Sequence, residues 1–126
     1  VRLWQGTSPI PIIVVGDTYK PSYSWLRSLE VAPILIAKEA YTGFTTIVAD
    51  SNDITFWLPK LLEYDIGHVL VEGGARLLQS FIRENLDDEV IRYTGSMSIE
   101  NGIPAPFYDQ FDERTLLDSD VYEHKY

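Results

Sequence analysis

The 126-residue sequence contains no cysteine. This absence excludes disulfide bonds, thiolate metal sites and catalysis by a thiol. The sequence also lacks any apolar run close to the roughly 18 residues that a membrane-spanning helix needs. Its first residues have neither the charged start nor the apolar centre of a signal peptide. We therefore expect a cytoplasmic protein with no membrane partner.

Basic residues are scarce. The chain has 10 Lys and Arg against 19 Asp and Glu, so its formal net charge is -9. Nonspecific nucleic-acid binding requires a basic face that releases counterions, and this balance argues against a nucleic-acid partner. A phosphate-bearing ligand would have to be held locally, by backbone N–H groups and a few well-placed cations.

Two familiar nucleotide-binding motifs are missing as well. The sequence has no G-x-G-x-x-G fingerprint and no P-loop lysine, which excludes an ordinary dinucleotide fingerprint and a P-loop triphosphatase. The two histidines, His68 and His124, stand far apart in the sequence. With no cysteine beside them they cannot form the zinc site of a nucleotide deaminase, and we expect no metal site.

The apolar pattern predicts an α/β fold, because short β-branched runs alternate with helical patterns. Continuous apolar strands of this kind are typical of a mostly parallel sheet that helices cover on both faces. The C-terminal segment alternates weakly around Asp118 and Ser119, which predicts a hairpin and an antiparallel edge. The other strands are expected at residues 10–16, 32–37, 44–50, 67–74 and 88–95.

Two helices stand out by the spacing of their apolar residues. The first is predicted from one stripe: Ile54, Trp57, Leu58, Leu61 and Leu62. Pro59 is compatible with this helix only near its first turn, where N–H groups have few helical partners. The second is predicted from inward positions at Leu77, Leu78, Phe81 and Ile82. A third, shorter helix is expected within residues 20–29.

Gly73 and Gly74 end the expected strand 67–74, directly before the second helix. In open α/β sheets, ligands bind beyond the carboxyl ends of the strands. The first turn of a helix has unpaired N–H groups that favour an anion, and glycine lets a phosphate approach the backbone and permits positive φ. The pair therefore predicts a phosphate or pyrophosphate cradle, with Arg76 adding charge. The alternative is a tight turn with no ligand.

Glu72 precedes the two glycines. A carboxylate at the end of a buried strand costs free energy unless it is exposed or bonded. It either accepts hydrogen bonds from ligand hydroxyls or an amide, or it lies on a strand end that faces the surface.

The segment VLVEGGARLLQSFI, residues 69–82, closely resembles the Val-Glu-Gly-Gly segment in the reductase domain of bacterial bifunctional riboflavin-biosynthesis deaminase/reductases. Residues 1–17, 86–95 and 101–106 are similar to other family segments in order and spacing. The resemblance covers nearly all of the chain and implies a dihydrofolate-reductase-like fold. It also implies a single, partial reductase domain over residues 1–126, without the zinc deaminase domain and without the first strands of the reductase domain.

The resemblance further implies a reaction, the NADPH-dependent reduction of the ribose of 5-amino-6-(5-phosphoribosylamino)uracil to a ribityl chain. Gly73, Gly74 and Ala75 would contact the pyrophosphate of the cofactor. Thr18 and Lys38 are candidates for its 2′-phosphate. Glu72 would lie near the substrate ribose or the nicotinamide, and Arg2 would help to hold the substrate phosphate. The resemblance also implies that the protein forms a homodimer.

Three departures weaken parts of this assignment, and one is the absence of the family's first strands and helix. VVGD at residues 14–17 and the following Thr18 replace the usual sequence at a cofactor-binding position. TGSMSIENG at residues 94–102 lacks the usual loop signature. Two other interpretations therefore stay open: a dihydrofolate or pteridine reductase relative, and a nucleotide-binding or dimerisation module without turnover.

Overall fold

The computed structural model describes residues 6–18 and 20–126, which fall into two compact units with the division between His68 and Val69. The first unit contains a parallel sheet and the second an antiparallel sheet. The expected α/β class, with a parallel sheet, flanking helices and an antiparallel C-terminal part, is confirmed.

The parallel sheet has three strands in the order β1-β2-β3. Strand β1 spans Ile12–Val14, β2 spans Ile34–Ala37 and β3 spans Thr45–Val48. All four residues of β2 are buried, as the central strand of a sheet covered on both faces requires. Three expected strands are thus confirmed, each shorter than its apolar run.

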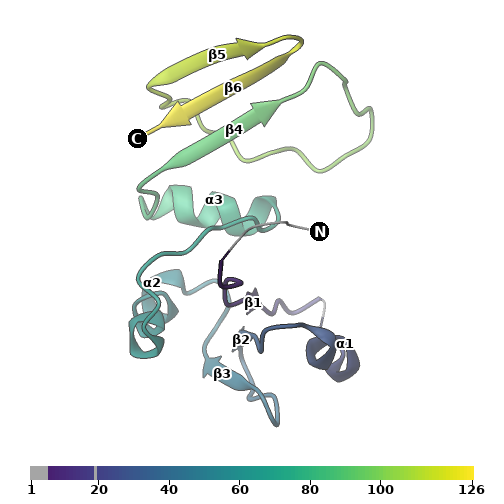
Figure 1. The fold of residues 1–126 in the computed structure, drawn as a ribbon, viewed down its shortest axis with the longest axis vertical. Helices are drawn as coiled ribbons and strands as arrows, with labels where there is room; N and C mark the ends of the chain where they lie inside the picture. The colour runs from purple at the N-terminus through teal and green to yellow at the C-terminus, as the bar shows by residue number, and fades with distance from the viewer. Residues whose placement is uncertain (1–5, 19) are drawn as a thin grey trace. The chain divides into compact units, whose positions relative to one another are not determined.

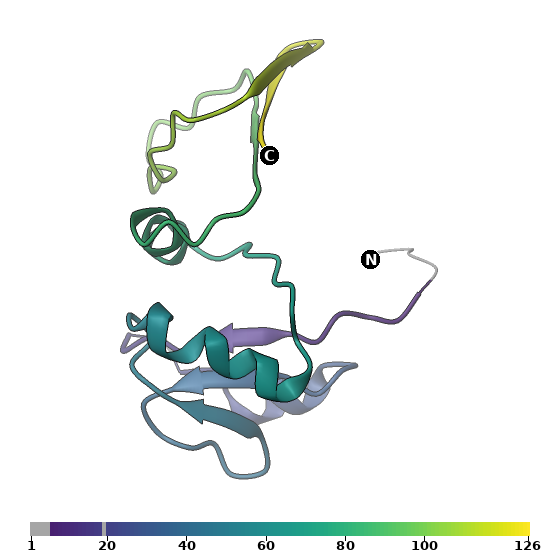
Figure 2. The ribbon, with the colours of Figure 1, turned by 90° about the vertical axis from the view of Figure 1, so that its left-hand side faces the viewer.

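Helices cover both faces of this sheet. Helix α1, Tyr23–Ser28, begins after Ser22, whose hydroxyl accepts a hydrogen bond from the backbone N–H of Trp25 at 3.3 Å. Helix α2, Ile54–Trp57, and the 3₁₀ helix η1, Pro59–Tyr64, lie against the other face (Figures 1 and 2). The largest fully buried side chains are Leu26, Leu35, Ile36, Ile54 and Leu61.

The prediction of one continuous helix over residues 54–62 is wrong in its second half. The backbone N–H of Leu58 bonds Ile54 O at 2.9 Å, which completes a single α-turn. Pro59 has no N–H to continue that ladder, and the chain tightens into η1, where Leu61 N bonds Leu58 O at 3.1 Å. The changed period keeps Leu61 buried but leaves Leu62 66% exposed.

The expected strand at residues 67–74 does not form. Its apolar composition suits a strand, but a strand exists only where a neighbour accepts its backbone hydrogen bonds. In the described chain, β1, β2 and β3 pair with one another, and the boundary between the two units falls at His68 and Val69. This segment has no regular secondary structure, and Leu70 is 79% exposed.

The second unit contains helix α3, Ala75–Arg83, followed by an antiparallel sheet in the order β4-β6-β5. Strand β4 spans Val90–Thr94, β5 spans Glu113–Leu117 and β6 spans Asp120–Lys125 (Figure 1). The predicted hairpin is confirmed: Leu117 pairs with Asp120, and Asp118 in the turn has φ 54°.

Arg92 of β4 joins this sheet to the loop before β5. Its guanidinium donates to the Glu123 carboxylate from Nε at 2.7 Å and contacts it through Nη2 at 2.6 Å. Nη1 donates to the carbonyl oxygen of Tyr108 at 3.0 Å, and the group lies 4.5 Å from the ring centroid of Phe111. One planar group therefore satisfies three partners, a geometry that lysine cannot reproduce.

We expect Arg92→Lys to lower the free energy of local unfolding of β4 and β6 by about 1 kcal/mol, because the charge remains while the fork is lost. Hydrogen exchange of the backbone amides in β4 and β6 measures this change. The matched control is Arg114→Lys, since Arg114 is exposed and lies 3.9 Å from the same carboxylate. Equal exchange in the two variants would contradict the role assigned to Arg92.

No helix among the described residues is long and apolar enough to cross a membrane.

Candidate functional site

The turn into α3 begins with two glycines. Gly74 is the N-cap of the helix in an extended conformation, with φ -65° and ψ 164°, and Ala75 is the first helical residue. The backbone N–H groups of Leu77 and Leu78 both bond Gly74 O, at 3.0 and 3.2 Å. The N–H groups of Ala75 and Arg76 precede the first intrahelical bonds, so they remain suited to an anion at the helix N-terminus.

The two glycines differ in the space around them. A Cβ on Gly73 would lie 2.6 Å from Leu77 Cδ2 and 3.2 Å from Leu77 Cβ, so a side chain here would displace that of Leu77. A Cβ on Gly74 would meet nothing within 4 Å. Neither residue has positive φ, so the conformational freedom of glycine is not used here. Glycine is a common N-cap residue, and the open space at Gly74 leaves its backbone accessible.

The other residues expected at the substrate are only partly described. Glu72 is exposed in the extended segment before α3, and this placement is compatible with both interpretations of its carboxylate. Arg2 lies outside the described residues. His68, expected on a strand, is exposed in the same segment, which has no regular secondary structure.

The carboxyl edge of the parallel sheet carries a cluster of charges. Asp17 and Thr18 follow β1, and Lys38 directly follows β2. Asp50 lies two residues after the last residue of β3. Lys38 Nζ lies 2.9 Å from Asp17 Oδ1 and 3.3 Å from Asp50 Oδ2. We call Asp17, Lys38 and Asp50 the edge cluster. All three side chains are about half exposed or more, and Thr18 is exposed beside them in the sequence.

The ion pairs of the edge cluster shift the pKa values of Lys38 and Asp50. Hydrogen bonds to Asp17 and Asp50, reinforced by their charges, raise the pKa of Lys38 above its ordinary value. The backbone N–H of Asn52, 2.9 Å from Asp50 Oδ1, and then the Lys38 ammonium hold the pKa of Asp50 below its ordinary value. Two carboxylates and one ammonium give the cluster a net charge of about -1.

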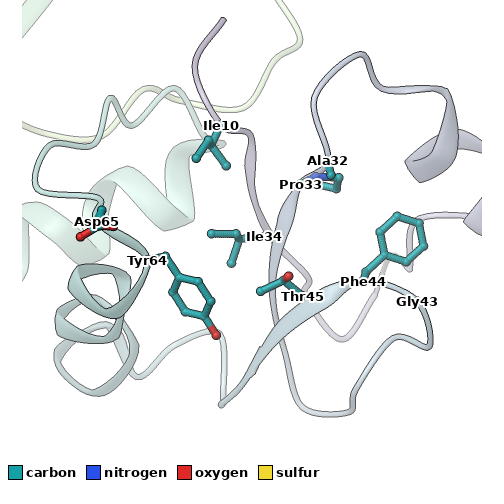
Figure 3. A pocket seen from close by; sticks show the side chains of 9 residues that line it. All are labelled: Ile10, Ala32, Pro33, Ile34, Gly43, Phe44, Thr45, Tyr64 and Asp65. Atoms are coloured by element: carbon teal, nitrogen blue, oxygen red, sulfur yellow. The ribbon is translucent and has the colours of Figure 1, made fainter. Parts of the chain in front are cut away.

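A separate hollow opens at the opposite edge of the same sheet (Figure 3). Its volume is about 360 Å³, and Ile34 and Thr45, the first residues of β2 and β3, lie on its wall. Figure 3 shows the ring of Tyr64 facing Ile34 across this space. The hollow lies at the amino ends of the strands, so it is not the ligand position expected for a parallel sheet.

Comparison with known proteins identifies the family. The RibD C-terminal domain family matches residues 1–106. The chain belongs to this family. One relative, the riboflavin biosynthesis protein RibD of Aquifex aeolicus, is 25% identical over 104 residues, which are 75% of this chain and 29% of that protein.

Two solved structures share the fold. A diaminohydroxyphosphoribosylaminopyrimidine deaminase/5-amino-6-(5-phosphoribosylamino)uracil reductase from Thermotoga maritima has a TM-score of 0.75 and 19% identity, covering 98% of this chain and 39% of that one. RibD of Acinetobacter baumannii has a TM-score of 0.72 and 20% identity, covering 98% and 41%. The chain thus spans well under half the length of these RibD relatives.

In this RibD-type chain, some of the predicted site residues lie together in the structure. Two residues that were not predicted also lie beside one of them. Gly73, Gly74 and Ala75 form one turn, while Lys38 lies in the other unit. The sequence argument did not select Asp17 and Asp50, the two partners of Lys38. The available signal was their position at the carboxyl ends of two expected strands, similar to the signal that selected Lys38. No group of three or more metal-ligating side chains occurs among residues 6–18 and 20–126.

Proposed function

We propose that the protein containing this chain acts in riboflavin biosynthesis and reduces 5-amino-6-(5-phosphoribosylamino)uracil to its ribitylamino form with NADPH. Family membership supports a reductase of this pathway, and the Thermotoga maritima relative carries the name of the reaction. The single observation that carries the proposal is the open position at Gly74, on the N-terminus of α3.

The turn suits a pyrophosphate for three reasons. The N–H groups of Ala75 and Arg76 point out of the helix N-terminus, where the helix dipole is positive. The missing side chain at Gly74 leaves the backbone accessible. The guanidinium of Arg76, which is exposed in the first turn, supplies a mobile positive charge. Together these groups would hold the diphosphate of NADPH without any P-loop lysine.

NADPH, once bound, supplies the hydride, and the protein supplies binding, orientation and electrostatics. Ala75 and Arg76 would fix the diphosphate and thereby the direction in which the rest of the dinucleotide extends. The Glu72 carboxylate would accept hydrogen bonds from hydroxyl groups of the substrate ribose. Arg2 would pair with the substrate phosphate. Holding the reacting carbon within roughly 3.5 Å of the hydride donor is the main contribution asked of these residues.

A direct assay tests the proposal. We expect full-length protein containing this chain to oxidise NADPH when 5-amino-6-(5-phosphoribosylamino)uracil is added, with loss of absorbance at the reduced nicotinamide band and formation of the ribitylamino product. Dihydrofolate is the control substrate, because a pteridine reductase relative would use it. No oxidation with the pyrimidine would refute the proposal, and binding of NADPH without turnover would favour a non-catalytic binding module.

A further inference from the structure

Figure 1 shows the loop that joins β4 to β5 as a long excursion of the chain. Residues 95–105 of this loop are all exposed, and the backbone bends at Asn101 and Gly102. These two residues form the only Asn-Gly sequence in the chain. At such a pair, the side-chain amide of the asparagine lies next to a backbone nitrogen that no side chain shields.

This arrangement allows an intramolecular reaction that needs only water. The backbone nitrogen of the glycine attacks the side-chain carbonyl carbon of the asparagine, Cγ, and forms a new N–Cγ bond. The Cγ–Nδ2 bond breaks, and the amide nitrogen leaves as ammonia with the proton that the backbone nitrogen gives up. Water then opens the resulting succinimide ring at either carbonyl carbon, which yields aspartate or isoaspartate. The net change is hydrolysis of the amide, with no oxidation or reduction.

The backbone nitrogen of Gly102 is open to this step. Within the described chain, its N–H group donates no hydrogen bond to another residue. The bend at residues 100–102 belongs to no helix or strand, so the attack breaks no hydrogen-bonded ladder. Asn101 is exposed as well, which leaves water free to reach the ring.

The other two asparagines are exposed too, but their surroundings oppose the reaction. Asn52 donates from Nδ2 to Asp50 Oδ1 at 3.0 Å, and the N–H of Asp53, the next residue, bonds Asp50 O at 3.0 Å. Asn85 is followed by Leu86, whose N–H bonds a carbonyl oxygen of α3 at 3.0 Å. In both cases the attacking nitrogen is engaged, and the side chain of the following residue hinders its approach.

We propose that Asn101 is a site of spontaneous deamidation, at which the folded protein converts to a form with aspartate or isoaspartate. The product gains one negative charge on a chain whose formal net charge is -9, and isoaspartate adds a carbon to the main chain. Both changes fall within the loop, because β4 ends at Thr94 and the next tie to the sheet is Tyr108, whose carbonyl oxygen accepts from Arg92 at 3.0 Å. The reaction uses neither cofactor nor substrate, so it is independent of the proposed function.

Peptide mass spectrometry of full-length protein, incubated at neutral and at mildly alkaline pH, tests the proposal. We expect the peptide that contains Asn101 to gain about 1 Da and to separate into an aspartate and an isoaspartate product. The rate should rise with pH, since the attacking nitrogen must give up its proton. Fragmentation of the peptide assigns the gain to Asn101 and not to Gln110, and a sample digested at zero time corrects for reaction during digestion.

Asn52 and Asn85 are controls within the same digest, and each is expected to react at least about tenfold more slowly than Asn101. Gly102→Ala is the matched variant. A Cβ at Gly102 would lie 3.6 Å from Ile99 Cγ2, which is an ordinary contact, so alanine fits this position. We expect Gly102→Ala to slow the reaction about tenfold and to leave thermal unfolding unchanged.

Three results would overturn the proposal. Equal rates at the three asparagines would mean that the Asn-Gly pair has no special reactivity. An unchanged rate in Gly102→Ala would mean that water attacks the amide directly, without the ring. A rate in the folded protein far below that of the chain unfolded in urea would show that the loop holds Asn101 away from Gly102 N.

Discussion

Leu61→Ala is expected to lower the free energy of unfolding of the first unit by about 3 kcal/mol, whereas Leu62→Ala is expected to lower it by less than about 0.5 kcal/mol. The two residues are neighbours in η1 and lose the same atoms. Leu61 is 2% exposed and Leu62 is 66% exposed, so only the first substitution leaves a cavity.

Urea unfolding followed by tryptophan fluorescence measures both variants. Every tryptophan of the chain lies within residues 1–68, so the signal reports the first unit, and Trp57, which is 2% exposed, changes its surroundings on unfolding. Equal losses in the two variants would mean that residues 54–62 form the continuous helix that the apolar stripe predicted. The pair of variants therefore tests the break at Pro59 directly.

Gly74→Asp is expected to weaken NADPH binding by about tenfold, because its carboxylate would face the diphosphate. The same change should not harm folding. A Cβ at this position meets no atom within 4 Å, and aspartate is a better N-cap than glycine by a few tenths of a kcal/mol. Lower affinity combined with equal or higher stability is the result that a purely structural turn would not give.

Gly74→Asn is the matched control, since asparagine has the shape of aspartate and caps helices equally well without the charge. We expect it to bind NADPH more weakly than the wild type but more tightly than Gly74→Asp. Calorimetry on full-length protein gives the affinities, and thermal unfolding gives the stabilities. Wild-type affinity in both variants would contradict the pyrophosphate cradle and remove the main support for the proposed function.

Local patterns in the sequence were sufficient for much of the fold. The β-branched runs placed β1, β2, β3 and β4, because buried parallel strands and half-buried antiparallel strands leave different apolar periods. The apolar spacing from Leu77 to Ile82 placed α3, and the alternation around Asp118 placed the last hairpin. The sequence also predicted the Gly-Gly turn before α3, since such a turn depends only on neighbouring residues.

Contacts between distant residues decided the rest. Residues 67–74 have the composition of a strand, but a strand needs a partner's backbone, and no local pattern reports whether one is present. Lys38 was selected as a candidate for the 2′-phosphate of the cofactor, and its ammonium pairs with Asp17, 21 residues earlier, and Asp50, 12 residues later. The sequence by itself determined which residues lie at the ends of strands. Only the tertiary structure decided what they pair with, because adjacent parallel strands bring together side chains that the chain separates by a whole crossover.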